Sequence, residues 1–172
     1  MVTLLGKQMP LKSQDLIKIM PHGFSMIMLD KITKLQPGKY GEAIKNVTVN
    51  ERYFRGHFPS NPIMPGVWEL ETMYQLAYLV ELASLSEEEQ NLYFTKRAFK
   101  LVKAKDIKFR QMVTPGDSLQ IFVDKINREQ STVYKCCVVS DNKRASEAIL
   151  TLEKVPFEES GFKISSKVGE VK

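Results

Sequence analysis

The sequence predicts an α+β fold in which a curved antiparallel β-sheet wraps around one long central helix. Residues 67–84 contain no helix breaker and are apolar on nearly every side, which is typical of a helix buried on all faces. Residues 26–49 before it and residues 92–155 after it have patterns typical of β-strands. No internal repeat or linker interrupts the chain, so we expect one sheet to cover the single helix.

The chain before the long helix predicts a short helix and a hairpin. Ser13 is expected to cap a helix that runs to Met20, where Pro21 ends it. Residues 26–35 and 40–49 are expected to pair as strands, because the Gln-Pro-Gly-Lys sequence between them suits a type II turn.

The chain after the long helix predicts only strands. These are residues 92–104, 106–110, 119–123, 131–140 and 144–155. Polar and apolar residues alternate in the second of them, so Ile107 and Phe109 are expected in the core and Lys108 and Arg110 on the other face. We expect a single domain over residues 1–155 and a polar C-terminal tail over 156–172.

Composition narrows the function classes. The chain has 172 residues, which suits one domain with a substantial core, and a formal net charge of +5. This mild charge favours acidic partners, and we expect neither nucleic-acid binding nor a membrane span. The N-terminus has no long apolar segment, so a cytoplasmic protein is expected. Cys136 and Cys137 are neighbours that point to opposite faces of a strand, so we expect no disulfide or metal pair.

The loop before the long helix holds the first candidate for catalysis. Three prolines and two glycines between Gly56 and Gly66 are expected to keep His57 in an ordered but irregular loop. Glu71 and Gln75 are four residues apart, so they share a helix face. A carboxyl on an apolar helix has its pKa raised by desolvation, which is the condition for a general acid at neutral pH.

A non-catalytic interpretation stays open at this point. His57 would bond a carbonyl of its own loop, and Glu71 would stabilise the positive end of the helix dipole. The spacing of the two residues does not decide between these interpretations. Glu69 is expected to be a solvated acid of the first helical turn.

The residues of this region form a motif that resembles a known family. The pattern H-F-P-x-x-P-x-M-P-G-V-x-x-x-E-x-M-x-Q, from His57 to Gln75, resembles the signature of the (3R)-hydroxyacyl-[acyl-carrier-protein] dehydratases of fatty acid biosynthesis, FabZ type, with the hot-dog fold. The Met-Pro-His sequence at 20–22, the segment 45–51 and the turn at 114–117 also match. The resemblance extends over roughly residues 11–155.

The resemblance implies both the reaction and its residues. His57 and Glu71 are the implied catalytic pair, facing each other from different subunits of a homodimer, and such dimers often form hexamers. His57 removes the α-proton of the 3-hydroxyacyl thioester, and Glu71 holds or protonates the departing hydroxyl. The N–H of Gly66, beside Val67, polarises the thioester carbonyl, and Gln75 belongs to the substrate site. A trans-2-enoyl thioester is the product, and no metal or cofactor is expected.

The sequence departs from the family pattern at four places. Ser60 replaces a usual glycine, and the loop around Gly23 lacks the usual arginine and proline. Trp68 and Tyr74 are larger than the usual residues, so they are expected to reshape the acyl tunnel. Acyl chain length, pathway and the choice between dimer and hexamer therefore stay open.

Two other functions also stay open. One is a hot-dog thioesterase in which Glu71 activates water, and the other is a non-catalytic module that binds acyl groups or the carrier. The retained His57 favours the dehydratase, because dehydration needs a base at the α-carbon and hydrolysis does not.

The implied partner is acyl carrier protein, which is acidic. Seven basic residues lie between positions 96 and 110, against the single acid Asp106. A basic patch beside a substrate tunnel attracts an acidic partner and steers its approach. We expect Lys108 and Arg110 to belong to this docking surface.

Overall fold

The computed structural model describes residues 3–4, 7–90, 97–126 and 132–156. The elements before the long helix are β1 (Thr3–Leu4), β2 (Lys7–Gln8), β3 (Leu11–Lys12), α1 (Ser13–Ile19), the 3-10 helix η1 (Phe24–Met26), β4 (Lys31–Gln36), β5 (Tyr40–Asn46) and the 3-10 helix η2 (Arg52–Arg55). The long helix α2 (Gly66–Leu82) is followed by β6 (Arg97–Phe109), β7 (Ser118–Lys125), β8 (Val133–Ser140) and β9 (Lys143–Pro156).

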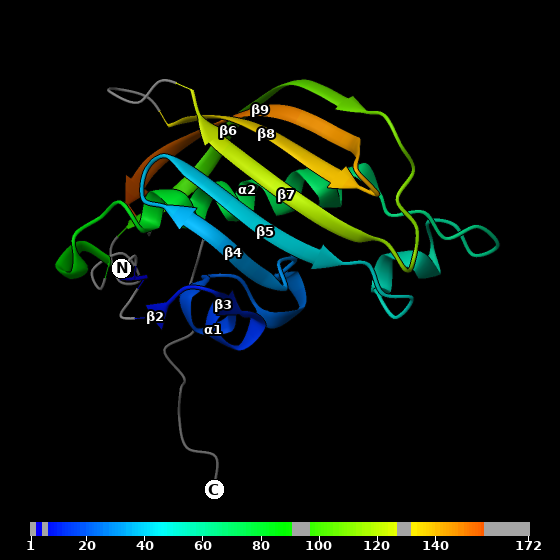
Figure 1. Ribbon diagram of the computed structural model, residues 1–172, viewed down its shortest axis with the longest axis horizontal. Coiled ribbons are helices and arrows are strands. Elements are labelled where there is room, and N and C mark those ends of the chain that lie inside the picture. The colour runs from blue at the N-terminus through cyan, green and yellow to red at the C-terminus, as the bar shows by residue number, and fades with distance from the viewer. Residues whose placement is uncertain (1–2, 5–6, 91–96, 127–131, 157–172) are drawn as a thin grey trace, which may run out of the picture.

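A seven-stranded sheet curves around α2, which confirms the predicted α+β fold (Figure 1). The strand order is β3-β4-β5-β7-β8-β9-β6, and all neighbouring strands are antiparallel. The strands β1 and β2 form a separate small sheet. The tail predicted for residues 156–172 lies, apart from Pro156, outside the described residues, so the domain boundary at 155 stays a prediction.

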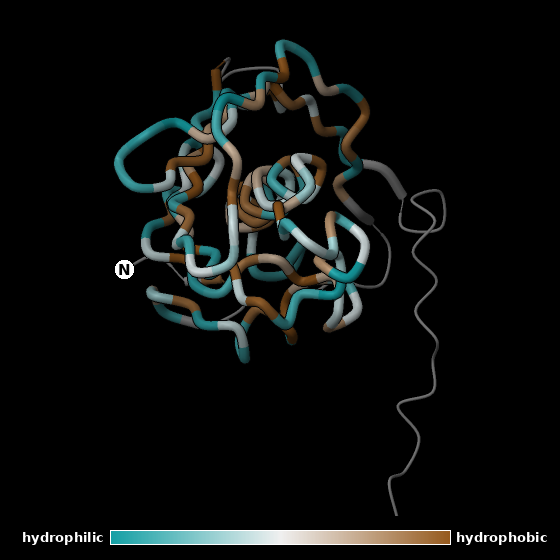
Figure 2. The backbone as a smooth tube through the Cα atoms, turned by 90° about the vertical axis from the view of Figure 1, so that its right-hand side faces the viewer, coloured by the Kyte–Doolittle hydropathy of each residue, from teal (hydrophilic) through white to brown (hydrophobic). Residues whose placement is uncertain are grey.

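The helix α2 occupies the centre of the fold, as the sequence predicts. It begins at Gly66 directly after Pro65, and every residue from Thr72 to Leu82 is buried. Figure 2 shows the helix end-on, with the backbone of the sheet and the N-terminal segment around it. No described helix is long and apolar enough to cross a membrane.

The turn of the β4–β5 hairpin and the first residues of β5 pack directly on α2. Gly38 has a φ of +63°, and the N–H of Lys39 donates to the Gln36 carbonyl at 3.0 Å, as a type II turn requires. The N–H of Gly38 also donates to the Val80 carbonyl of α2 at 2.9 Å. A Cβ at Gly41 would lie 2.9 Å from Val80 Cγ2, so only glycine allows this close approach.

Two predictions near the N-terminus are wrong. The strand expected from residue 26 begins only at Lys31, because the N–H of Met28 donates to the Gln75 side chain of α2 at 2.9 Å instead of joining the sheet. Ser13 is the first residue of α1 and not its cap, since its hydroxyl donates to the Asp30 carbonyl at 2.9 Å.

The strand β6 differs from its prediction in two respects. The two segments expected as separate strands form one continuous strand. The register of its pairing with β9 shifts between Lys105 and Lys108. Asp106 lies within this shift and has a φ of +53°. Residues 92–96 of the first segment lie outside the described residues. Ile107 and Phe109 are 39% and 52% exposed, so their assignment to the core is wrong. The register shift lies in β6, an edge strand that pairs only with β9 within the described sheet.

Candidate active site

Backbone hydrogen bonds hold the loop that carries His57. The N–H of His57 donates to the Tyr53 carbonyl at 2.9 Å, and the N–H of Ile63 donates to the His57 carbonyl at 3.0 Å. The N–H of Met64 then donates to the Val113 carbonyl at 2.8 Å, which ties the end of the loop to the segment before β7. The expected ordered, irregular loop is therefore present.

The ring of His57 is oriented by the loop itself. Its Nδ1 lies 2.8 Å from the carbonyl oxygen of Ile63. A carbonyl only accepts hydrogen bonds, so Nδ1 carries the proton and Nε2 keeps its lone pair. The ring also stacks on Phe58 at a centroid distance of 4.2 Å. His57 thus makes the loop contact of the non-catalytic interpretation, and this contact leaves the lone pair on Nε2.

A cavity of about 580 Å³ opens beside His57. Its lining includes His57, Gly66, Glu69, Phe109, Arg110 and Met112. The loop, the first turn of α2 and the end of β6 therefore meet at one place. Phe109 and Met112 are 52% and 69% exposed, so the lining of the cavity includes exposed apolar side chains.

Gly66 places the positive end of α2 in this cavity. As the first helical residue it has an N–H without an acceptor inside the helix, and the helix dipole favours negative charge there. A Cβ at Gly66 would lie 2.4 Å from Cε1 of Phe109, so the ring of Phe109 covers the helix end only because this residue is glycine. Val67, the neighbour in the motif, is 65% exposed.

Gln75 joins Glu71 to the segment before β4, as their predicted common helix face suggests. The Nε2 of Gln75 donates to Glu71 Oε1 and to the Met26 carbonyl, both at 2.7 Å. Its Oε1 accepts the N–H of Met28 at 2.9 Å. The amide of Gln75 is buried and fixed by these contacts, and it holds the carboxyl of Glu71 in place.

The surroundings of Glu71 favour its protonated form, in the predicted direction. Burial raises the pKa of Glu71, and the hydrogen bond from Gln75 partly opposes this rise. His22 Nε2 lies 3.7 Å from Glu71 Oε1, and burial lowers the pKa of His22, so this imidazole is a mostly neutral neighbour. The sequence alone does not single out His22 as a site residue, although the Met-Pro-His sequence at 20–22 is part of the resemblance.

Glu69 contradicts its prediction as a solvated acid. It is 2% exposed and lines the cavity beside His57. Burial raises the pKa of Glu69 to about 7, and a contact with the Ser146 hydroxyl opposes this rise. Ser146 pairs with Phe109 across β9 and β6, so the ends of these strands cover Glu69. The burial of Glu69 therefore depends on the tertiary placement of β6 and β9, which the sequence pattern around Glu69 does not show.

Within one subunit the structure does not bring His57 and Glu71 to the same cavity. Among the described residues, the helical acid in the lining of the His57 cavity is Glu69 and not Glu71. Residues two apart on a helix point to nearly opposite sides, so Glu71 faces the segment around Met26 and Met28 with Gln75.

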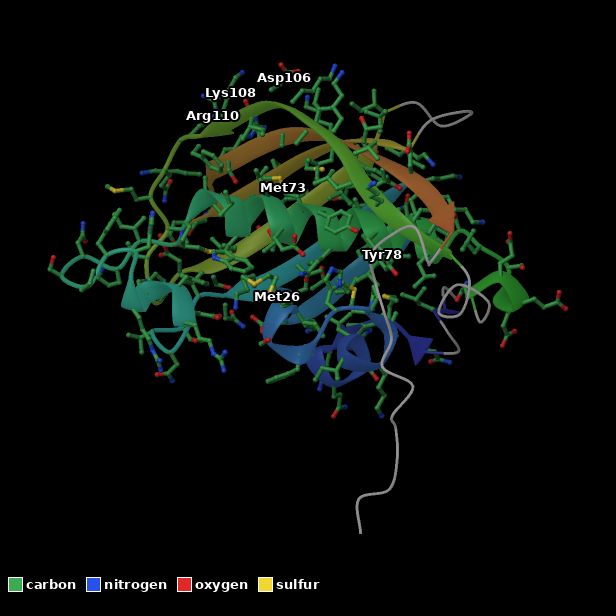
Figure 3. All side chains as sticks on the ribbon, turned by 180° about the vertical axis from the view of Figure 1, so that it is seen from behind. Met26, Met73, Tyr78, Asp106, Lys108 and Arg110 are labelled. Carbon is green, nitrogen blue, oxygen red and sulfur yellow. The ribbon has the colours of Figure 1, made fainter. Side chains whose placement is uncertain are left out.

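The two basic residues expected at the docking surface share one acidic partner. Lys108 Nζ and Arg110 Nη2 lie 3.4 Å and 2.6 Å from Glu147 Oε1, so both point the same way, as predicted. Arg144 also binds Glu147, and these cations hold the pKa of Glu147 at about 2. Figure 3 shows Lys108 and Arg110 on the outer side of the sheet, away from Met73 and Tyr78 of α2.

Known proteins are similar to this chain in sequence over most of its length. Residues 20–149 match the FabA-like domain family. The 3-hydroxyacyl-[acyl-carrier-protein] dehydratase FabZ of Ehrlichia ruminantium (strain Gardel) is 39% identical over 136 residues, which cover 78% of this chain and 90% of the relative. The FabZ of Lawsonia intracellularis (strain PHE/MN1-00) is 37% identical over 149 residues, which cover 86% of this chain and 94% of the relative.

Solved structures are similar in fold at much lower identity. A mutant of a thioesterase from Pseudomonas aeruginosa has a TM-score of 0.61 and 12% identity, with 88% of this chain and 98% of that chain covered. A hot-dog-like protein from Thermanaerovibrio acidaminovorans has a TM-score of 0.56 and 17% identity, with coverage of 73% and 87%. At these identities the similarity shows the hot-dog fold alone.

Proposed function

The chain belongs to the FabZ-type 3-hydroxyacyl-[acyl-carrier-protein] dehydratases, with their FabA-like domain, and we propose that His57 and Glu71 perform the dehydration here. As a member of this family the protein removes water from a (3R)-3-hydroxyacyl thioester and leaves a trans-2-enoyl thioester. The observation that carries the proposal for the site is the hydrogen bond from His57 Nδ1 to Ile63, because it leaves Nε2 as a base in a cavity.

His57 starts the reaction as the general base. Its Nε2 takes a proton from the α-carbon of the bound thioester, and the electron pair of that C–H bond moves towards the thioester carbonyl. The N–H of Gly66, beside Val67 at the positive end of α2, receives the negative charge that develops on the carbonyl oxygen.

Glu71 completes the elimination as the general acid. The raised pKa of Glu71 keeps its carboxyl protonated closer to neutral pH, and Gln75 fixes its orientation. The proton of Glu71 passes to the 3-hydroxyl as the C–O bond breaks, so water leaves and the double bond forms. His57 then holds a proton and Glu71 lacks one, and proton exchange through solvent restores both.

The complete site belongs to two copies of the chain. Glu69 and Glu71 point to opposite sides of α2, and the former faces the His57 of its own subunit, so Glu71 is available to the His57 of another subunit. Exposed apolar residues belong to this region: Phe109 and Met112 line the cavity, and Phe58 and Val67 directly follow the lining residues His57 and Gly66 in the sequence. The strand β6, one of the two edge strands of the described sheet, also offers an edge for pairing. A homodimer, or a trimer of such dimers, buries both features.

Acyl carrier protein is the partner that fits the basic end of β6. Arg110 lines the His57 cavity and Lys108 lies beside it, so a negatively charged carrier would bring its phosphopantetheine arm to the cavity mouth. One hot-dog domain over residues 1–155 and a cytoplasmic location belong to the same proposal.

The experiment is a pair of single substitutions with product analysis. His57→Ala and Glu71→Gln should each lower kcat by about 10²–10⁴-fold, the usual contribution of general acid–base groups, without unfolding the protein. Wild-type protein should form an enoyl thioester, whereas free acid plus thiol would indicate a thioesterase. Near wild-type rates in both variants would contradict the assignment of the site.

Subunit mixing tests the shared site. In a mixed dimer, the Glu71→Gln subunit supplies His57 and the His57→Ala subunit supplies Glu71, so one site is intact. Random exchange should restore about one quarter of the wild-type rate, because half of the dimers are mixed and each has one working site. Verified exchange with no recovery would show that each subunit uses its own pair.

A further inference from the structure

Glu69 is a buried acid that the mechanism above does not use. Its side chain is 2% exposed, and its Oε2 has no hydrogen-bond partner among the described residues. A buried carboxyl oxygen without a partner costs free energy, which a hydrogen-bonding ligand would recover. The cavity of about 580 Å³ that Glu69 lines is where such a ligand would lie.

The base His57, the N–H of Gly66 and the carboxyl of Glu69 meet in this cavity. His57 enters from the loop, and Gly66 and Glu69 come from the same face of α2 because they are three residues apart. Arg110 is the cation in the described lining, and its Nη2 donates to Glu147 at 2.6 Å on the outer side of the sheet. The positive charge of Arg110 is therefore directed to Glu147. Within the cavity, Glu69 lies beside the base His57 and the backbone N–H of Gly66.

The neutral form of Glu69 makes it a hydrogen-bond donor. Burial raises the pKa of Glu69 to about 7, and the contact with Ser146 opposes this only in part. A protonated carboxyl donates one hydrogen bond, whereas a carboxylate only accepts. Carboxylic acids kept neutral by an apolar site are known to donate to an enolate oxygen beside a second donor.

We propose that Glu69 is a further catalytic residue, whose carboxylic acid donates a hydrogen bond to the thioester carbonyl oxygen beside the N–H of Gly66. When His57 removes the α-proton, negative charge collects on that oxygen, and two donors stabilise it better than one. Glu69 keeps its own proton throughout, and Glu71 still supplies the proton of the departing water. The inference rests on the proposed role of His57 as the base.

The test compares two substitutions that differ in their ability to donate. Glu69→Leu removes the donor and should lower kcat by about 10²–10³-fold with little change in KM, the usual effect of losing one oxyanion donor. Glu69→Gln keeps an N–H donor and should retain most of kcat. The wild-type rate should fall as pH rises through the pKa of Glu69, and Glu69→Gln should lack the part of this fall that Glu69 causes, because an amide does not ionise. A fall caused by ionisation of the general acid Glu71 should be the same in both proteins. Glu87→Gln, at an exposed acid, is the matched control with unchanged rate and pH profile.

Each outcome decides the proposal. A Glu69→Leu protein that melts like wild type and keeps its kcat within about threefold overturns it, as does a Glu69→Gln profile with the same alkaline fall as wild type. If Glu69→Leu does not fold, the Glu69→Gln profile alone decides. His57→Ala is measured in parallel. Full activity of His57→Ala would overturn the proposed function, because His57 would then not be the base. An inactive His57→Ala together with an unaffected Glu69→Leu would overturn only the role of Glu69.

Discussion

Gln75 donates a hydrogen bond to Glu71 over 2.7 Å, and the same side-chain amide holds both Met26 and Met28 by their backbones. The general acid and the segment before β4 therefore depend on one buried side chain. The side chain of Glu71 is 24% exposed, so part of the carboxyl stays open to a substrate while the amide fixes its orientation.

Gln75→Leu should lower both stability and activity. The buried N–H of Met28 would lose its acceptor, which costs about 1–3 kcal/mol, and Glu71 would lose the donor that orients it. We expect the Tm to fall by several degrees and kcat to fall by about tenfold or more. Calorimetry and steady-state kinetics would measure both, with Gln120→Leu at an exposed position of β7 as the control. An unchanged kcat in the folded variant would contradict the positioning role.

Glu69 should make folding stability depend on pH. Its pKa rises from 4.5 to about 7 on folding, so the folded state binds the proton more tightly. The resulting stabilisation is fully present below pH 4.5 and is lost as pH rises through about 7. Between these limits the free energy of unfolding of wild type should fall by about 3 kcal/mol more than that of Glu69→Gln. Parallel curves for the two proteins in urea titrations would show that Glu69 ionises normally.

The charge pattern at the end of β6 should control carrier affinity. Lys108→Glu should raise KM for carrier-bound substrates, more strongly at about 0.01 M ionic strength, where the screening length is about 30 Å. Glu147→Gln should lower this KM, because it frees Lys108 and Arg110 from their shared partner. Turnover of a short neutral thioester should change in neither variant.

Arg110 needs separate treatment in that experiment, since it also lines the His57 cavity. Arg110→Glu, added to Lys108→Glu, is expected to raise KM for carrier-bound substrates further. Equal losses for carrier-bound and short substrates in Lys108→Glu would mean that this surface is structural and does not dock the carrier.

Tyr74 should limit the length of the acyl chain. It lies about one turn along α2 from Glu71, is 7% exposed, and packs edge-on against the rings of His22 and Tyr78 at 6.2 Å. The alkyl chain of the substrate starts at C3, the carbon whose hydroxyl Glu71 protonates. We therefore expect the alkyl chain to extend along this turn of α2. Tyr74→Leu should raise the preference for 3-hydroxyoctanoyl over 3-hydroxybutanoyl thioesters by about tenfold, if the released space holds about two of the four additional methylenes, since each buried methylene contributes about 0.8 kcal/mol.

Tyr74→Phe is the control for chain length. It removes only the hydrogen bond of 2.8 Å from the Tyr74 hydroxyl to the Phe99 carbonyl, at a cost of about 1 kcal/mol in stability. Its preference among acyl lengths should equal that of wild type. The same preference in Tyr74→Leu would place the acyl chain elsewhere.

The features that depend on local pattern could be predicted from the amino-acid sequence alone. The absence of breakers after Gly66 predicts α2, the Pro37-Gly38 pair predicts the turn with positive φ, and the spacing of Glu71 and Gln75 places them on one face. Each of these follows from backbone geometry within a few residues, so no distant contact is needed to predict it.

Which side chains are covered depends on the tertiary placement of the strands. Glu69 is buried because the ends of β6 and β9 close over the first turn of α2, and Phe109 is exposed because the register of β6 shifts at the edge of the sheet. The same placement separates His57 from Glu71 within one subunit. Burial and register depend on strands far away in the sequence, so periodicity along one segment cannot predict them.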